Sequence, residues 1–251
     1  MPLRTAVLPV PIFTTRALGA WALLAGASGF TNGAALVACG RMVTHVTGIA
    51  TRIGNGVGQS TLLFEYSLVF VSFLLGGYFA STTVIRAARV GSRSPYRFLF
   101  LVEMAVLAVL ALAGALGFFS AFGATFDTPA DYALLSALAF SSGLQNATVG
   151  IATQSAVRTT HMTGPATDLA IQLGCLTAGT PETRPEAWRQ VRLRLVKIVG
   201  FILGGALAPF FAHRMGFLVF LLPIAPLYLG AHFGFARATV QRDASARQFT
   251  T

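Results

Sequence analysis

The chain alternates long apolar runs with short polar stretches, and the length of the runs predicts helices. Six runs reach roughly 20 predominantly apolar residues, the length of a helix that crosses a bilayer. They lie near 17–39, 61–85, 98–122, 132–153, 193–213 and 215–235. The first run follows Arg4 and Arg16, as the apolar region of a signal peptide would. Because it continues to Cys39 and has a counterpart later in the chain, we interpret it as a span.

A polar octapeptide interrupts this pattern twice. Residues 44–51 read THVTGIAT and residues 160–167 read THMTGPAT, 116 positions later. Other stretches match in the same order: SGFTN (28–32) with SGLQN (142–146), and FVSFLLGGYFA (70–80) with IVGFILGGALA (198–208). Three ordered matches predict two repeats of three spans, and an odd number of spans inverts the second repeat in the membrane.

The predicted fold is therefore an all-α polytopic membrane bundle of six spans, built as two inverted three-span repeats. The expected parts are a cytoplasmic N-terminal segment (1–16), membrane repeat one (17–122), membrane repeat two (123–235) and a cytoplasmic tail (236–251). The two repeats should superpose by a rotation of about 180° about an axis in the membrane plane. The Gly-Gly pairs at 76–77 and 204–205 predict close helix packing.

Each octapeptide is followed by a short apolar stretch, at 49–60 and 165–176. Thr47 or Gly48 can cap a helix there, and Pro165 suits a first helical turn. Two more full crossings would move the arginine-rich residues 86–97 outside, against the distribution of positive charge in membrane proteins. We therefore expect broken or re-entrant helices that begin at each THxTG turn. Their N-termini would form one polar, anion-favouring site near the bilayer centre, and each repeat would contribute half of it.

The predicted binding residues come from both repeats. They are Asn32, Thr44, His45, Thr47, Gly48, Arg52, Asn146, Thr160, His161, Thr163, Gly164 and Asp168. Arg52 and Asp168 occupy matching positions, so they either pair across the axis or lie separately in solvent. The two histidines either pack or carry a proton. The two asparagines either bridge helices or line a cavity.

Two acids and two cysteines complete the candidate chemistry. Glu65 and Glu103 are either helix-end acids that reach the headgroups or interior partners of a proton or cation. Cys39 and Cys175 lie in unrelated contexts and indicate no disulfide framework. Two histidines alone lack the usual ligand spacing of a metal site. We expect no cofactor.

Composition supports the membrane assignment. The 251 residues are 55% hydrophobic and 10% charged, whereas a soluble domain carries about 25% charged residues. The net charge of +10 could indicate nucleic acid as a partner. The arginines lie in loops, however, and form no basic stripe with interleaved aromatic residues. The expected partner is therefore the lipid bilayer and not nucleic acid.

The ordered motifs also resemble a known family. Gly29-Phe30-Thr31-Asn32 with the first THxTG, and Gly143-Leu144-Gln145-Asn146 with the second THxTG and Thr167-Asp168-Leu169-Ala170, are similar to the YoaK-like family of bacterial inner-membrane proteins, a domain of unknown function. The resemblance covers roughly residues 17–235. It implies a multi-span protein of the bacterial inner membrane. Family members commonly carry asparagine after the first THxTG, where this chain has Ile49.

The expected function is that of a small-solute transporter or channel with its site at the repeat interface. The chain has no GxSxG, HExxH or phosphate-loop motif, so we expect no enzyme. The solute is unknown, and helix N-termini would favour an anion. The alternative is a non-transporting membrane sensor or interaction protein. A homo-oligomer is left open.

Basic residues predict the orientation of the spans. With six spans and both termini in the cytoplasm, 15 of the 18 basic residues lie inside, and Arg41, Arg52 and Arg214 lie outside. A cysteine at position 93, in the arginine-rich residues 86–97, should therefore be protected from a membrane-impermeant thiol reagent in intact cells. Labelling at that position would reverse the topology.

Overall fold

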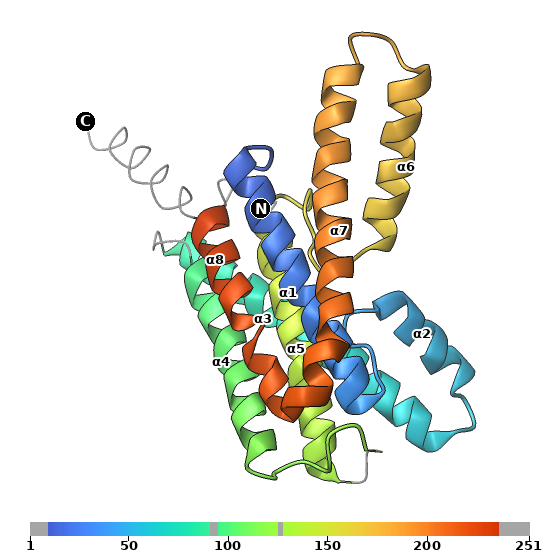
Figure 1. Ribbon diagram of the computed structural model, residues 1–251, viewed down its shortest axis with the longest axis vertical. Helices are drawn as coiled ribbons and strands as arrows, with labels where there is room; N and C mark the ends of the chain where they lie inside the picture. The colour runs from blue at the N-terminus through green and yellow to red at the C-terminus, as the bar shows by residue number, and fades with distance from the viewer. Residues whose placement is uncertain (1–9, 91–94, 125–127, 236–251) are drawn as a thin grey trace.

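The protein is all-helical over the residues that the computed structural model describes, which are 10–90, 95–124 and 128–235 (Figure 1). The elements in chain order are α1 (Thr15–Cys39), α2 (Val46–Asn55), α3 (Ser60–Arg89), α4 (Tyr96–Ala115), α5 (Pro129–Ala152), α6 (Thr163–Ala178), α7 (Arg184–Met215), the 3-10 helix η2 (Gly216–Leu221) and α8 (Ile224–Phe235). The all-α prediction is confirmed for these ranges. The expected tail 236–251, position 93 and most of the segment 1–16 lie outside them.

Within the described ranges, four helices are long and apolar enough to cross a membrane: Thr15–Cys39, Ser60–Arg89, Tyr96–Ala115 and the continuous stretch Arg184–Leu221. The shortest of them has 20 residues, which at 1.5 Å per residue matches a hydrocarbon core of about 30 Å. These helices leave large apolar side chains such as Leu74, Leu101 and Ile202 exposed on the outside of the bundle. Such a surface suits contact with lipid, whereas the largest apolar patch on a typical soluble monomer is only a few hundred Å².

Three of the expected spans have different bounds in the structure. The pattern predicts that the third reaches residue 122, but α4 ends at Ala115 and Gly117 follows with φ of +80°. The run 193–213 belongs to a longer helix, because α7 begins at Arg184, so residues 184–192 before the expected span are helical as well. The last run is broken: η2 is separated from α8 by Leu222 and Pro223, and proline cannot donate a helical hydrogen bond.

The bundle is built on two pairs of helices whose backbones touch at glycine. α1 lies along α7, and α3 lies along α5. A methyl group at Gly29 would overlap the carbonyl oxygen of Phe201, and one at Gly143 would overlap that of Phe73. Gly29 matches Gly143 in the repeated stretches, and Phe201 matches Phe73. The same close approach is therefore made twice, once in each helix pair.

A second set of matched glycines lies on the partner helix of each pair and makes the same kind of contact. A methyl group at Gly204 would overlap the carbonyl oxygen of Gly26, and one at Gly76 would overlap that of Phe140. Backbones this close leave no room for a Cβ atom, and small residues are how membrane helices approach each other. The prediction that the glycine pairs serve helix packing is confirmed.

The two helices of each pair run in the same direction, and the two pairs run in opposite directions (Figure 1). α1 and α7 both run downward in Figure 1, whereas α3 and α5 both run upward. The beginning of α1, the end of α3 and the end of α8 lie at the same end of the bundle. α6 and the first half of α7 extend beyond the other helices at that end, and α2 projects sideways from the lower half.

Replacing Gly29 by alanine should lower the free energy of unfolding by about 1–3 kcal/mol, because the new methyl group meets backbone that cannot rotate away. Gly19 lies in the same helix with nothing within 4 Å of a new methyl group. Gly19→Ala should therefore leave stability unchanged or raise it, since alanine favours helix. Thermal unfolding of both variants in detergent measures the difference. Equal melting temperatures would contradict the close α1–α7 contact.

Candidate functional site

The two octapeptides meet across one cavity. α2 begins at Val46 and α6 at Thr163, so each short helix starts inside its THxTG motif, as expected for broken segments. The cavity between the two turns has a volume of about 180 Å³. Its lining residues are Asn32, Met42, Thr44, His45, Val46, Thr47, Thr160, His161, Met162, Thr163 and Phe201. The structure thus brings seven predicted residues from both halves together: Asn32, Thr44, His45, Thr47, Thr160, His161 and Thr163.

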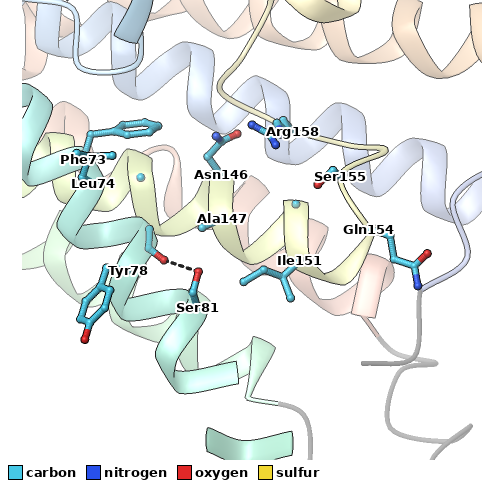
Figure 2. A pocket seen from close by; sticks show the side chains of 13 residues that line it. Phe73, Leu74, Tyr78, Ser81, Asn146, Ala147, Ile151, Gln154, Ser155 and Arg158 are labelled. Carbon is cyan, nitrogen blue, oxygen red and sulfur yellow. Dashed lines mark hydrogen bonds between the residues drawn. The ribbon is translucent and has the colours of Figure 1, made fainter. Parts of the chain in front are cut away.

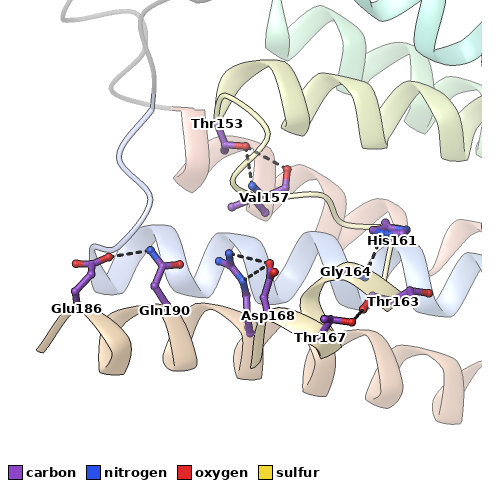
Figure 3. Close-up of polar contacts among 10 residues, drawn as sticks. Thr153, Val157, His161, Thr163, Gly164, Thr167, Asp168, Glu186 and Gln190 are labelled. Carbon is purple, nitrogen blue, oxygen red and sulfur yellow. Dashed lines mark hydrogen bonds and ion pairs between the residues drawn. The ribbon is translucent and has the colours of Figure 1, made fainter. Parts of the chain in front are cut away.

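The histidines shape the turns, and the expected caps at Thr47 and Gly48 are wrong. The N-cap residues are His45 and Met162, and neither side chain makes a capping hydrogen bond. Instead the N–H of Gly164 donates to Nε2 of His161 over 3.1 Å (Figure 3). A methyl group at Gly164 would lie 3.0 Å from that nitrogen. The glycine of the motif therefore makes room for the ring that lies against the helix start.

The first turn repeats this arrangement. A methyl group at Gly48 would lie 2.6 Å from the ring of His45. The threonines match as well, because Thr51 Oγ1 donates to the carbonyl oxygen of Thr47 and Thr167 Oγ1 donates to that of Thr163, each over 3.1 Å. The spacing of histidine and glycine in the octapeptide is thus a structural requirement of both turns.

His161 accepts at Nε2, so its ring is neutral with the proton on Nδ1. Burial lowers the pKa of His161, and the positive charges of Arg158 and Lys197 lower it further. Both effects favour the neutral ring that the hydrogen bond requires. The structure supports the interpretation that this histidine is a hydrogen-bonded packing residue, since its ring accepts from the N–H of Gly164. Its role as a proton carrier stays a prediction.

The two matched asparagines differ. Oδ1 of Asn32 accepts hydrogen bonds from the N–H groups of Val43 (3.0 Å) and Thr44 (3.1 Å), an arrangement we call the Asn32 latch. It ties the loop after α1 to the helix itself. In the second half, Oδ1 of Asn146 is buried and has no hydrogen-bond partner among the described residues. The matching latch on Thr160 is therefore open.

The open latch faces a cavity of about 500 Å³, more than twice the volume of the one between the turns (Figure 2). This cavity lies between α3 and α5, and its lining includes Tyr78, Ser81 and Asn146 together with Arg158 from the following loop. The segment from Asn146 to Thr160 is two residues longer than the segment from Asn32 to Thr44. Within it Gln154 (φ 51°) and Ser155 (φ 69°) adopt left-handed backbone that L residues rarely use. Strain of this kind tends to collect at functional sites.

A third cavity of about 210 Å³ lies between the other two. It shares Ser155 and Arg158 with the large cavity and His161 with the central one. Its lining residues are Ser155, Ala156, Arg158, His161, Gly164, Pro165, Asp168, Arg194 and Lys197. The three cavities therefore adjoin one another from the α3–α5 groove to the THxTG turns.

The predicted pairing of Arg52 with Asp168 is wrong. Asp168 Oδ2 pairs instead with Nη2 of Arg194 over 3.1 Å, and Nε of Arg194 also donates to it (Figure 3). The guanidinium of Arg52 lies 5.9 Å from the ring centroid of Tyr66. The reason is geometric: the two turns meet at their beginnings, but α2 then follows α3 while α6 follows α7. Each side chain therefore contacts the long helix of its own half.

Both candidate acids are buried and do not reach the outer surface. Glu65 is 5% exposed and pairs with Arg41 at 2.6 Å. Glu103 is 4% exposed, and its Oε2 has no hydrogen-bond partner in the described part of the chain. The headgroup interpretation fails for both. Across residues 10–90, 95–124 and 128–235, no group of three or more His, Cys, Asp or Glu side chains lies close enough to hold a metal ion.

The sequence pattern did not reveal three residues of the cavities: Arg158, Arg194 and Lys197. The last two lie near the start of the expected span 193–213, and the pattern assigned them no role in a site. The repeat contained the signal, since the position that matches Lys197 is the buried Val69, just before the aligned stretches begin. A lysine in place of a core valine, beside an apolar run, indicates an interior charge.

The fold and its cavities define the class: an all-helical protein with apolar helices able to cross a membrane. The chain belongs to the family described as protein of unknown function (DUF1275), whose profile matches residues 20–232. The match includes both octapeptides but does not carry the narrower YoaK-like name. No curated protein and no solved structure matches the chain.

Exchanging the charges of Asp168 and Arg194 should restore stability that either single reversal removes. Because the Asp168 side chain is 48% exposed, we expect a coupling of only about 0.2–1 kcal/mol. A double-mutant cycle of D168R and R194D, read by thermal unfolding in detergent, measures it. The matched exchange of D168R with R52D should show no coupling. Coupling in that second cycle would instead support the pair that the structure contradicts.

Proposed function

We propose that the protein is a small-solute transporter of the bacterial inner membrane, not an enzyme, with its binding site where two inverted halves meet. One observation carries the proposal: the two THxTG turns face each other across a single cavity. Irregular backbone at membrane depth is tolerated where it is buried in protein or lines a polar cavity. Broken helices that meet at a shared central site are typical of transporters built from inverted repeats.

The inverted relation is supported by the matched glycine contacts. Gly29 against Phe201 and Gly143 against Phe73 are one contact made twice with the halves exchanged. α1 and α5, the first helices of the two halves, run in opposite directions (Figure 1). An axis in the membrane plane that exchanges the halves accounts for both facts.

The proposal includes six crossings with both termini in the cytoplasm. Beyond the four apolar stretches, of which Arg184–Leu221 already includes η2, the remaining crossings would be α5 and α8. Basic side chains support this orientation. Arg16 at the start of α1, Arg86 and Arg89 at the end of α3, and Arg97 at the start of α4 lie near one end of the bundle (Figure 1).

The mechanism we propose is alternating access through exchange of the two latches. In this structure Asn32 holds its loop, and the matching Asn146 is free beside a large cavity. That cavity lies along the later turns of α3 and α5, toward the end that we assign to the cytoplasm (Figure 1). The other state would close Asn146 onto the N–H groups of Thr159 and Thr160 and release Asn32. The structure would then be the inward-facing state.

Asn146→Ala should abolish transport without lowering stability, because Oδ1 of Asn146 makes no hydrogen bond in this state. Asn32→Ala should abolish transport and also lower the melting temperature, because two hydrogen bonds worth about 0.5–1.5 kcal/mol each are lost. A thermal-shift screen of the purified protein against inorganic anions, amino acids and small organic acids identifies ligands. Uptake of each ligand into proteoliposomes then measures transport.

Thr82→Ala is the matched control, since this α3 hydroxyl bonds only backbone of its own helix and should leave uptake unchanged. Normal uptake by Asn146→Ala would refute the exchange of latches. Ligands that bind but are never taken up would refute transport and favour the sensor or interaction protein.

A further inference from the structure

The cavity between α6 and α7 contains more positive than negative charge. Arg158, Arg194 and Lys197 line it, and Asp168 is its only acid among the described residues. Lys197 is 1% exposed and makes no ion pair or hydrogen bond within residues 10–90, 95–124 and 128–235. Burying an ammonium group without a partner is costly. A partner from outside the chain would remove that cost.

Arg194 points to the same conclusion. Its Nε and Nη2 atoms donate to Asp168, which leaves Nη1 buried and without a hydrogen-bond partner among the described residues. The pairing fixes the plane of the guanidinium, so Nη1 is held in place for another acceptor. Guanidinium forks and ammonium groups are the side chains that bind oxyanions best.

The other half shows that these charges are not required by the fold. Aligning the octapeptides places Met42 opposite Arg158. Aligning the glycine stretches places Tyr66 opposite Arg194 and Val69 opposite Lys197. Val69 is 1% exposed, so an apolar side chain fills the matching position of the same architecture. The three cations of the second half are therefore an addition to the repeat.

The start of α6 contributes the partial positive charge of a helix N-terminus but few free hydrogen-bond donors. Gly164 and Pro165 line the cavity at the beginning of this 16-residue helix. The N–H of Gly164 is used by His161, and proline has none. The positive end of the helix dipole remains, and it favours an anion at this place. Side chains must provide the hydrogen bonds.

We propose that this cavity binds a small oxyanion, such as a carboxylate, sulfate or phosphate group, between Lys197, Nη1 of Arg194 and Arg158. A volume of about 210 Å³ accommodates a group of this size. The cavity adjoins the central one through His161, so the oxyanion is the charged part of the solute that the proposed transporter carries. The inference rests on the proposed function only for this last step.

Isothermal titration of the purified protein with sodium acetate, sulfate and phosphate tests the site, with sodium chloride at equal ionic strength as the reference. At least one oxyanion should bind where chloride does not. Lys197→Met keeps the buried stem and removes the charge, so it should fold and weaken binding by at least about tenfold. Arg158→Gln should weaken binding as well. Arg192→Gln, an exposed change on the same helix, should have no effect.

Binding that is absent, or unchanged in Lys197→Met, overturns the oxyanion site. Uptake of an uncharged solute in proteoliposomes would then still support the transporter. Oxyanion binding that needs Lys197, with no uptake of the bound anion, leaves the site and overturns transport instead. A double variant of Lys197→Met with Arg192→Gln that matches Lys197→Met alone confirms that the loss is local.

Discussion

Backbone contact at glycine is the constraint on which this structure depends. α1 reaches α7, and α3 reaches α5, at places where no Cβ atom fits between a helix and the carbonyl groups of its neighbour. Between apolar helices in lipid there is little hydrophobic gain, so close van der Waals contact must hold the bundle together. Gly29 and Gly143 make this contact at matching positions. Short loops connect α1 and α5 to the octapeptide turns, so the distance between the turns depends on these interfaces.

The candidate site lies between the two turns at which the short helices α2 and α6 begin. Each THxTG motif follows an irregular connection and starts a short helix, and the histidine ring lying against its glycine fixes the geometry of that start. Backbone groups at such a break need partners. In the first half Asn32 provides them, and in the second half the matching Asn146 does not. The two halves thus differ in the hydrogen bonding of one matched asparagine. Asn32 holds the backbone of its loop, whereas Asn146 lies beside a large cavity.

Charge distinguishes the two halves further. The first half pairs its buried acid Glu65 with Arg41 beneath the turn. The second half places Lys197 and a partly unpaired Arg194 against its cavity. Matched positions in the repeated stretches therefore carry chemically different side chains in the two halves, such as Val69 opposite Lys197.

The sequence alone determined the helical class, the presence of apolar helices long enough to cross a membrane and the meeting of the two motifs, because each rests on patterns along the chain: run length, glycine position and ordered repetition. It also indicated that short helices begin at THxTG. It did not determine that η2 and α8 break the last run, although that run contains Pro223, since a proline can equally kink a continuous helix. Nor did it determine the partners of charged side chains. Matching positions suggested that Arg52 and Asp168 should pair, but pairing depends on which helix each short segment lies against. Only the tertiary structure decided that α6 packs along α7. As a result Asp168 pairs with Arg194, and Lys197 is buried beside them.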